Sequence, residues 1–552
     1  MRIRVACALL LSVSLLARQP EHALHAMVVA QEPLAADVGL RVLQSGGNAI
    51  DAAVAVAFAL AVTHPVAGNI GGGGFLLARF ADGRATFIDF REKAPLAATR
   101  NMYLDSKGNV TKDSLVGWRA AGVPGTVRGL ELAHKKYGHR PWTELVDPAI
   151  QLASAGFPVS YPLSASLESD SGLLSEFPES KRIFVKAHYG DKLVQPDLAA
   201  TLTRIRDRGA SDFYDGETAQ KLVAAMASNG GLITLADLKA YQAVEQEPLR
   251  GHYHGDEIIT APPPSAGGVG LLQMLAMLDG SGYEKTGPGS AASIHYVAEV
   301  MRRFYADRSE YFSDPDFAPV PVSKLLDPHY IASRRATIDR EHATPSSQIR
   351  PGVLTAHEST ETTHFNIVDA EGNAVAVTYT LNNSYGSGVT VPGLGFLLND
   401  EMDDFAAKPG TENLFHLIQG EANAIQPGKR PVSSMVPTIV TRDGKFFLAL
   451  GAPGGSRIIN GVLQVFLNVV DFHMNVQDAV DWPRFHHQWM PDVLYVEKGI
   501  SPDTIALLRS MGHQVSQLDP TSGVARVEAI LNQDGWLQGA TDPHGSGKAE
   551  GY

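Results

Sequence analysis

The sequence has 552 residues, of which 44% are hydrophobic and 19% are charged. At about 150 residues per domain, this is enough chain to bury a large core without disulfide or metal crosslinks. The 46 Lys and Arg residues against 59 Asp and Glu residues give a formal net charge of −13. This charge argues against a nucleic-acid groove or a polybasic membrane surface, so we expect a globular protein with no nucleic-acid partner.

Residues 1–26 have the pattern of a secretory signal peptide. Arg2 and Arg4 form a short basic region, and the apolar run that follows, residues 5–17, is too short to span a bilayer. Cleavage after Ala26 would remove Cys7, the single cysteine of the chain. We therefore predict a periplasmic or secreted bacterial protein without thiol catalysis, Cys-ligated metal or a membrane span in its mature part.

Predicted helices dominate the first part of the chain, and predicted strands with alternating apolar and polar residues dominate the last part. A polar, irregular segment at 309–361 separates the two and is the predicted linker. The other predicted elements are helices at 33–44, 49–63 and 269–278, short strands at 75–80 and 85–90, and mostly helices between 125 and 245.

The sharpest local pattern is a β-hairpin over residues 362–382, in which two alternating runs flank a Gly-containing turn. If the turn centres on Glu371, then Thr362 lies opposite Thr380 and Asn382 shares the same face. Two hydroxyls and an amide would then lie together. Ordinary sheets also contain Thr–Thr pairs, so this pattern alone leaves a purely structural role open.

Two further segments carry polar groups that fit either a site or plain structure. Gly454 and Gly455 connect a predicted strand to a helix start, where backbone N–H groups form an oxyanion hole or simply a tight turn. The acidic stretch 399–405 places several carboxylates in a tight turn, which by itself is typical of a solvated loop. The sequence contains neither G-x-S-x-G nor H-E-x-x-H, and the adjacent pair His486-His487 is unsuited to one metal, so we expect no metal and no cofactor.

Taken together, these segments resemble the γ-glutamyltranspeptidases, bacterial glutathione hydrolases of the N-terminal-nucleophile class. The resemblance implies an α+β fold, a four-layer αββα sandwich, made as one precursor that cuts itself between Glu361 and Thr362. A mostly helical large chain, 27–361, and a β-rich small chain, 362–552, would remain together as a heterodimer. The matching segments are 69–75, 89–92, 262–268, 362–382, 399–405, 430–435, 453–457 and the ending Gly551-Tyr552.

The resemblance also implies roles for single residues. Thr362 resembles the nucleophile that attacks the γ-glutamyl carbonyl, and Thr380 resembles the residue that hydrogen-bonds and tunes it. Gly454 and Gly455 resemble the oxyanion-hole donors. The remaining matches would hold the glutamyl head group: Arg91, Ser433 and Ser434 at the α-carboxylate, and Asn382, Glu401 and Asp404 at the α-ammonium.

Some matched positions differ from those of certain relatives. Glu401 stands where some bacterial members have Gln, and a carboxylate should bind an ammonium at least as well. Phe415 stands in the segment that resembles a substrate lid, at a position where some relatives carry Tyr, and it lacks the hydroxyl that could bond across the site. The third difference is His544, which stands where Arg is expected.

The implied reaction is cleavage of the γ-glutamyl amide of glutathione and related compounds, with the acyl group passed to water, amino acids or peptides. A glutaryl or cephalosporin acylase would use the same nucleophile on another acyl group. A binding protein with a structural hairpin is a third possibility. Arg91, Glu401 and Asp404 suit an amino-acid head group and so favour the transpeptidase.

Overall fold

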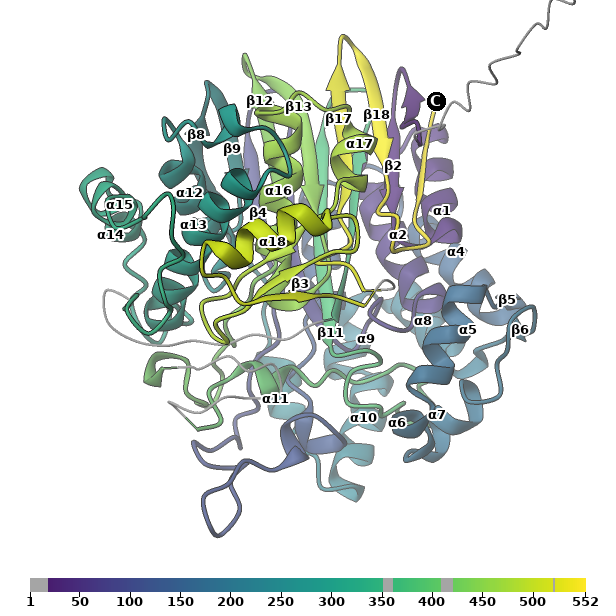
Figure 1. The fold of residues 1–552 in the computed structure, drawn as a ribbon. Helices are drawn as coiled ribbons and strands as arrows, with labels where there is room; N and C mark the ends of the chain where they lie inside the picture. The colour runs from purple at the N-terminus through teal and green to yellow at the C-terminus, as the bar shows by residue number, and fades with distance from the viewer. Residues whose placement is uncertain (1–17, 351–360, 409–419, 520–521) are drawn as a thin grey trace, which may run out of the picture.

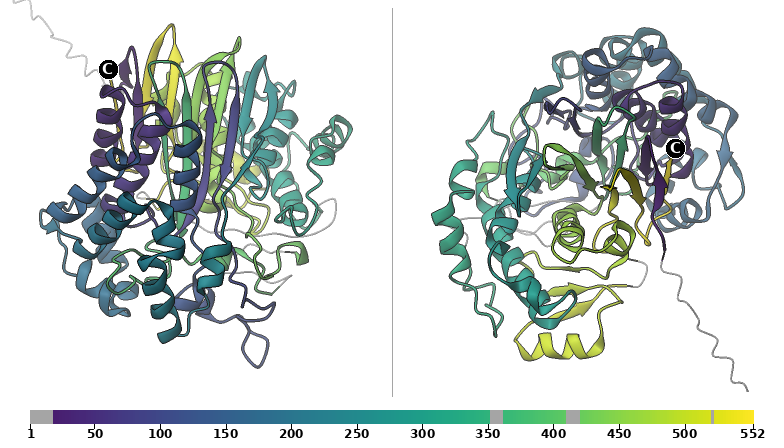
Figure 2. Two further views of the ribbon diagram at one scale, coloured as in Figure 1. Left: turned by 180° about the vertical axis from the view of Figure 1, so that it is seen from behind. Right: turned by 90° about the horizontal axis from the view of Figure 1, so that it is seen from above.

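The computed structural model describes residues 18–350, 361–408, 420–519 and 522–552. Two seven-stranded sheets stack between helices on both outer sides (Figure 1). Figure 2 shows the same layers from behind and from above. This is the predicted αββα sandwich, and the α+β fold class is confirmed.

The sheet that carries the hairpin combines strands from both ends of the chain. Every neighbouring pair in it is antiparallel. Strands from before and after the predicted cut therefore share one sheet, which would hold two cleaved chains together. Its order is β19 (Lys548–Gly551), β2 (Met27–Ala30), β10 (Glu361–Val368), β11 (Ala374–Asn382), β3 (Gly73–Arg79), β4 (Ala85–Asp89) and β7 (Val244–Gln246).

The second sheet packs its inner face on the first. Val29 and Leu77 of the first sheet share one hydrophobic core with Ile439 and Leu448 of the second. The order of the second sheet is β1 (Glu21–Ala23), β18 (Trp536–Ala540), β17 (Glu528–Gln533), β13 (Lys445–Gly451), β12 (Thr438–Arg442), β9 (Asp256–Thr260) and β8 (Leu249–Tyr253).

Helices close both outer faces of the sandwich. Over the first sheet lie α1 (Pro33–Gln44), α2 (Ala49–Thr63), α3 (Thr126–Tyr137) and α4 (Trp142–Ala155), and every residue of α2 is buried. Over the second lie α12 (Gly267–Leu278), α13 (Ala291–Tyr311), α16 (Ile458–Val470) and α17 (Val476–Asp481). No helix in the described ranges is long and apolar enough to cross a membrane.

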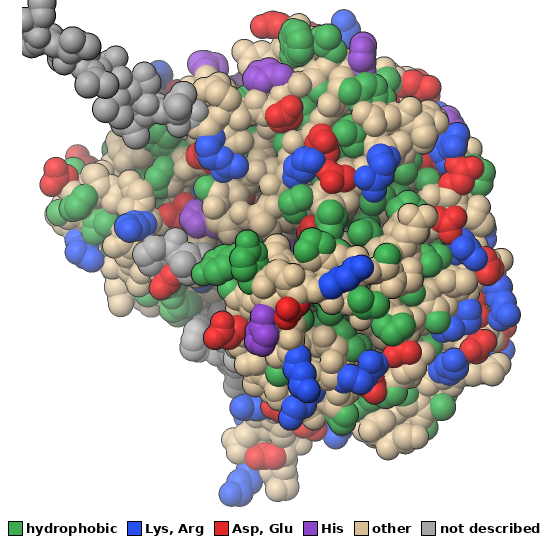
Figure 3. All heavy atoms as spheres, turned by 90° about the vertical axis from the view of Figure 1, so that its right-hand side faces the viewer, with side chains coloured by type: hydrophobic (Ala, Val, Ile, Leu, Met, Phe, Trp, Pro, Cys, Tyr) green, Lys and Arg blue, Asp and Glu red, His purple; other side chains and the backbone are tan. Residues whose placement is uncertain are grey.

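Smaller elements surround these layers. α8 (Pro196–Arg208) packs against α4. The same part of the chain also forms α5 (Tyr161–Ser169), α6 (Ser171–Ser175), α7 (Pro178–Ile183), α9 (Ala210–Asp215), α10 (Glu217–Ser228), α11 (Leu235–Ala240) and the pair β5 (Phe157–Pro158) and β6 (Lys192–Leu193). The rest are α14 (Val322–Leu325), α15 (Pro328–Arg335), α18 (Pro502–Ser510), β14 (Phe485–His486), β15 (Leu494–Val496) and β16 (Val515–Gln517). On the face shown in Figure 3, basic and acidic side chains are interspersed.

The predicted linker at 309–361 is partly wrong. α13 extends into it, and α14 and α15 follow. α15 begins with a strong start signal, because the Asp327 side chain accepts hydrogen bonds from two backbone N–H groups and Pro328 occupies the first turn. Of the predicted signal peptide, residues 1–17 lie outside the described residues, while 21–23 form β1 beside β18. The cut after Ala26 remains a prediction.

Candidate active site

The predicted hairpin is present in the predicted register, with one difference at the end where Thr362 lies. Thr363 pairs with Tyr379, and the register continues to Val368 and Ala374. Next to Thr362 the register shifts, because Glu361 pairs with Asn382. Thr362 thus faces a β-bulge of β11 instead of forming a simple pair with Thr380. Bulges of this kind re-aim side chains beside active sites.

Thr362 and Thr380 nevertheless line one small cavity, together with most of the predicted site. Its free volume is about 10 Å³, which is at the lower limit for one water molecule. Substrate can therefore enter only by displacing side chains that now contact one another. The lining residues are Arg91, Thr362, Thr380, Glu401, Asp404, Ser433, Ser434, Met435, Gly455 and Ile458.

A buried guanidinium joins the two acidic residues of the site. Arg91 donates hydrogen bonds to the carboxylates of Glu401 and Asp404, and its Nη2 donates to the backbone oxygen of Val432 at 3.0 Å. The acidic stretch 399–405 is buried throughout, so the solvated-loop alternative is wrong. The groups expected to hold opposite ends of a substrate hold each other in this structure.

Burial sets the electrostatics of the cluster. It raises the pKa of Glu401 well above the usual value and raises that of Asp404, and Arg91 opposes both shifts. Glu92 was not singled out from the sequence, yet its Oε2 lies 3.8 Å from Nη1 of Arg91. Burial raises the pKa of Glu92 to about 8. The sequence offered one signal for Glu92, because it forms an adjacent charged pair with Arg91 directly after the apolar strand predicted at 85–90.

Several buried polar atoms of the site lack a hydrogen-bond partner among the described residues. They are Asn382 Oδ1, Glu401 Oε2 and Ser434 Oγ. The Asn382 amide donates to the backbone oxygen of Asp400 at 3.0 Å, and this bond fixes its orientation. A buried acceptor without a partner costs roughly 1–3 kcal/mol, which a bound ligand can recover. Two acceptors suit an ammonium, and the hydroxyl suits a carboxylate.

The neighbouring loop presents backbone N–H groups. Gly454 and Gly455 have φ of 135° and 56°, a region that favours glycine. They begin the turn that leads into α16, and Gly455 lines the cavity beside Thr362. No hydrogen bond engages either N–H in the part of the chain that the structure describes. The arrangement fits an oxyanion hole.

Ser433 is positioned by the Pro-rich segment before α12. Its backbone N–H donates to the oxygen of Pro264 at 3.1 Å, and its hydroxyl accepts from the N–H of Met435 at 3.2 Å. Met435 and Ile458 form an apolar wall that sequence reasoning missed, since no pattern distinguishes them from core residues.

The remaining predicted features have different outcomes. Glu361 and Thr362, the residues on either side of the predicted cut, are neighbours in β10, and the cut remains a prediction. Phe415 lies outside the described residues. Among the residues described, no cluster of His, Cys, Asp and Glu side chains could hold a metal ion.

The fold and the site together define a class of protein. A threonine on a central strand between stacked sheets, next to free backbone donors, is the arrangement of N-terminal-nucleophile hydrolases, which act on amide bonds through an ester. Comparisons with known proteins narrow this class to one family.

The model of the gamma-glutamyltranspeptidase family matches residues 35–552, and the chain belongs to this family. It is 49% identical to a glutathione hydrolase proenzyme of Escherichia coli, over 95% of this chain and 91% of that protein. It is 38% identical to an acylase ACY 1 proenzyme of Pseudomonas sp. strain SE83, over 95% of this chain and 93% of that one.

Two solved structures are also similar. A cephalosporin acylase from Bacillus halodurans superposes with a TM-score of 0.87 at 27% identity, covering 97% of both chains. A chain of the Helicobacter pylori gamma-glutamyltranspeptidase superposes with a TM-score of 0.57 at 47% identity, covering 58% of this chain and 93% of that one.

Proposed function

We propose that this chain is the precursor of a γ-glutamyltransferase and glutathione hydrolase with Thr362 as its nucleophile. The observation that carries the proposal is one cavity that joins Thr362 to Arg91, Glu401 and Asp404. The glutathione hydrolase relatives at 46–49% identity support the same activity. The acylase relative is more distant in sequence, at 38% identity.

Self-cleavage would be the first reaction of the nucleophile. The Thr362 hydroxyl attacks the Glu361 carbonyl, the acyl group moves from nitrogen to oxygen, and water hydrolyses the ester. This step frees the α-amine of Thr362, which then serves as the base of the mature enzyme. The products are the chains 27–361 and 362–552. The relatives are themselves named proenzymes, which supports processing.

Turnover would repeat the same chemistry on substrate. The α-amine takes the Thr362 proton as the hydroxyl attacks the γ-glutamyl carbonyl. The N–H groups of Gly454 and Gly455 stabilise the oxyanion. The leaving amine departs with a proton, and water or the amine of an amino acid or peptide then attacks the γ-glutamyl ester. These steps need no metal or cofactor.

The charged groups would select the amino-acid head group. Arg91, Ser433 and Ser434 receive the α-carboxylate, while Asn382, Glu401 and Asp404 receive the α-ammonium. The signal-peptide pattern at residues 1–26 supports export to the periplasm or the medium.

Purified protein incubated separately with γ-glutamyl-p-nitroanilide and glutaryl-p-nitroanilide tests this proposal. We expect p-nitroaniline release mainly from the γ-glutamyl compound. Preference for the glutaryl compound would establish the acylase instead, and release from neither would favour a binding protein.

A further inference from the structure

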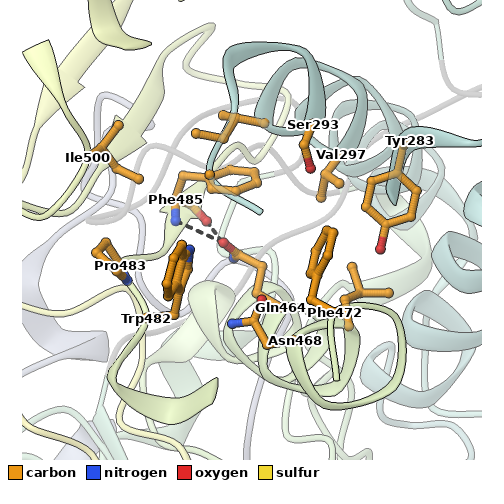
Figure 4. A pocket seen from close by; sticks show the side chains of 13 residues that line it. Tyr283, Ser293, Val297, Gln464, Asn468, Phe472, Trp482, Pro483, Phe485 and Ile500 are labelled. Carbon is orange, nitrogen blue, oxygen red and sulfur yellow. Dashed lines mark hydrogen bonds between the residues drawn. The ribbon is translucent and has the colours of Figure 1, made fainter. Parts of the chain in front are cut away.

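Cavities away from the catalytic site differ in the chemistry of their walls. Figure 4 shows one between α13 and α16, with a free volume of about 30 Å³ and no charged side chain in its lining. Gln464 crosses it to exchange hydrogen bonds with the backbone of Phe485, at 2.8 Å and 3.0 Å. It has room for about one water molecule and offers a larger ligand no charge.

A second cavity is larger and charged. It lies where β2 and α2 end, between α5 and the segment that follows β18, and its free volume is about 230 Å³. Ser160, Pro162, Pro543 and Gly545 in its wall are exposed, so the cavity opens to solvent. The lining residues are Gln31, Glu32, Thr63, His64, Val66, Ser160, Pro162, Leu163, Ser166, Ser384, Arg526, Pro543, His544, Gly545 and Ser546.

Opposite charges line this cavity without pairing with each other. The half-buried Arg526 guanidinium has no ion pair or hydrogen bond among the described residues. Glu32 accepts a hydrogen bond from the N–H of Ala35 at 3.0 Å, and burial raises its pKa. A half-buried guanidinium and a carboxyl group in one cavity both gain from a ligand that carries the complementary charges.

Histidine and serine side chains complete the wall. Burial, assisted by the charge of Arg526, lowers the pKa of His64 to about 3, so this ring is an uncharged hydrogen-bonding group. His544 uses Nδ1 to bond Asp542 at 2.9 Å, which leaves its Nε2 for a ligand. The hydroxyl of Ser166 accepts from Tyr385 at 2.9 Å and keeps its own proton to donate.

We propose that this cavity is a second binding site, for a free α-amino acid. Its carboxylate would bind the Arg526 guanidinium and its ammonium would bind Glu32. At roughly 30 Å³ for each water molecule, the cavity holds about the volume of eight waters, which suits a single amino acid better than a tripeptide.

The site is separate from the catalytic cavity but joined to the same strand. Successive side chains of a strand point to opposite faces. Thr362 lines the catalytic cavity, while the Thr363 hydroxyl donates to Gln31 Oε1 at 3.3 Å, and Gln31 lines the second cavity. Gln31 Nε2 donates to the backbone oxygen of Arg526 at 3.3 Å.

The same residue also touches the oxyanion loop. The backbone N–H of Arg526 donates to the oxygen of Pro453 at 3.3 Å, directly before Gly454. A ligand on Arg526 is therefore linked to both the nucleophile strand and this loop. The proposal goes beyond the proposed function and does not depend on it.

Calorimetric titration of the purified full-length protein with L-alanine, propionate and L-alaninamide tests the site. We expect L-alanine to bind at least tenfold more tightly than the other two, because each lacks one charge. Arg526→Gln should weaken L-alanine binding at least tenfold, and Arg526→Lys should restore most of it. Arg250→Gln, a surface change elsewhere, should have no effect.

A variant of Asp404, which lines the catalytic cavity, separates the two sites. Asp404→Asn should leave the Kd for L-alanine unchanged, whereas loss of binding in this variant would place the amino acid in the catalytic cavity and overturn the proposal. Equal binding by wild type and an Arg526→Gln protein with the same unfolding midpoint would also overturn it. Neither result bears on γ-glutamyl turnover, which is measured separately.

Discussion

Replacing Asp404 by Asn removes one of the two carboxylates that contact Arg91. The side chains of Arg91 and Asp404 are 1% and 4% exposed, so water cannot take the place of a lost charge. The Asn side chain still offers an oxygen to Arg91, and Glu401 remains bonded to it. The variant should therefore fold and cut itself, and the loss should appear when the substrate ammonium is bound.

The expected loss follows from the burial of this pair. Removing one partner of a buried charge pair costs about 2–5 kcal/mol. At about 1.4 kcal/mol for each tenfold change, kcat/KM for glutathione or γ-glutamyl-p-nitroanilide should fall roughly 30- to 4,000-fold. Glutaryl-p-nitroanilide has no ammonium, so its kcat/KM should change little, and the gap between the two substrates should narrow.

Asp403→Asn is the matched control. It makes the same charge change one residue away, but Asp403 accepts its hydrogen bond from Ser114 at 2.7 Å and is not in the lining of the cavity. Its γ-glutamyl kinetics should stay near those of wild type. Asp404 does not bind the substrate ammonium if Asp404→Asn leaves γ-glutamyl turnover unchanged or reduces glutaryl turnover by the same factor.

Three further predictions address the nucleophile, the oxyanion loop and stability. Thr362→Ala should remain one band on a denaturing gel while wild type splits in two, and cleavage of the variant at 361/362 would assign the cut to another protease. Gly454→Ala should lower kcat by roughly tenfold or more with little change in KM, because φ of 135° disfavours a side chain. An unchanged kcat would argue against an oxyanion hole formed by this loop. His364 has its pKa lowered by burial from 6.5 to about 3, so its stabilising effect is full above pH 6.5 and is lost as pH falls toward 3. Protonation of His364 in the unfolded chain should therefore lower the free energy of unfolding by about 2 kcal/mol between pH 7 and 5. In the His364→Gln variant, the free energy of unfolding should fall less over the same pH range.

Local signals were enough to predict much of the fold. The helices at 33–44 and 49–63 were predicted to the residue, since Pro33 begins one and Asn48 forms a capping box with Asp51 at the start of the other. The hairpin register followed from its turn. The helices α14 and α15 were missed because short, polar helices give a weak periodic pattern.

The site itself could be predicted only in part. Arg91 and Asp404 are 313 positions apart, so their mutual pairing depends on how the sheets stack, which no local pattern contains. The bulge at Thr362 and the burial of Glu92 likewise depend on tertiary packing. The family resemblance brought the predicted site residues into one list, and the structure shows that most of them line one cavity.

In the proposed reaction, Thr362 forms the γ-glutamyl ester. The most direct test is acid quenching of the processed enzyme during turnover of γ-glutamyl-p-nitroanilide, followed by mass spectrometry of its peptides. We expect one γ-glutamyl group on the peptide that begins with Thr362, and none after incubation with glutaryl-p-nitroanilide. A γ-glutamyl adduct on any other residue, or continued turnover by Thr362→Ala, would contradict it.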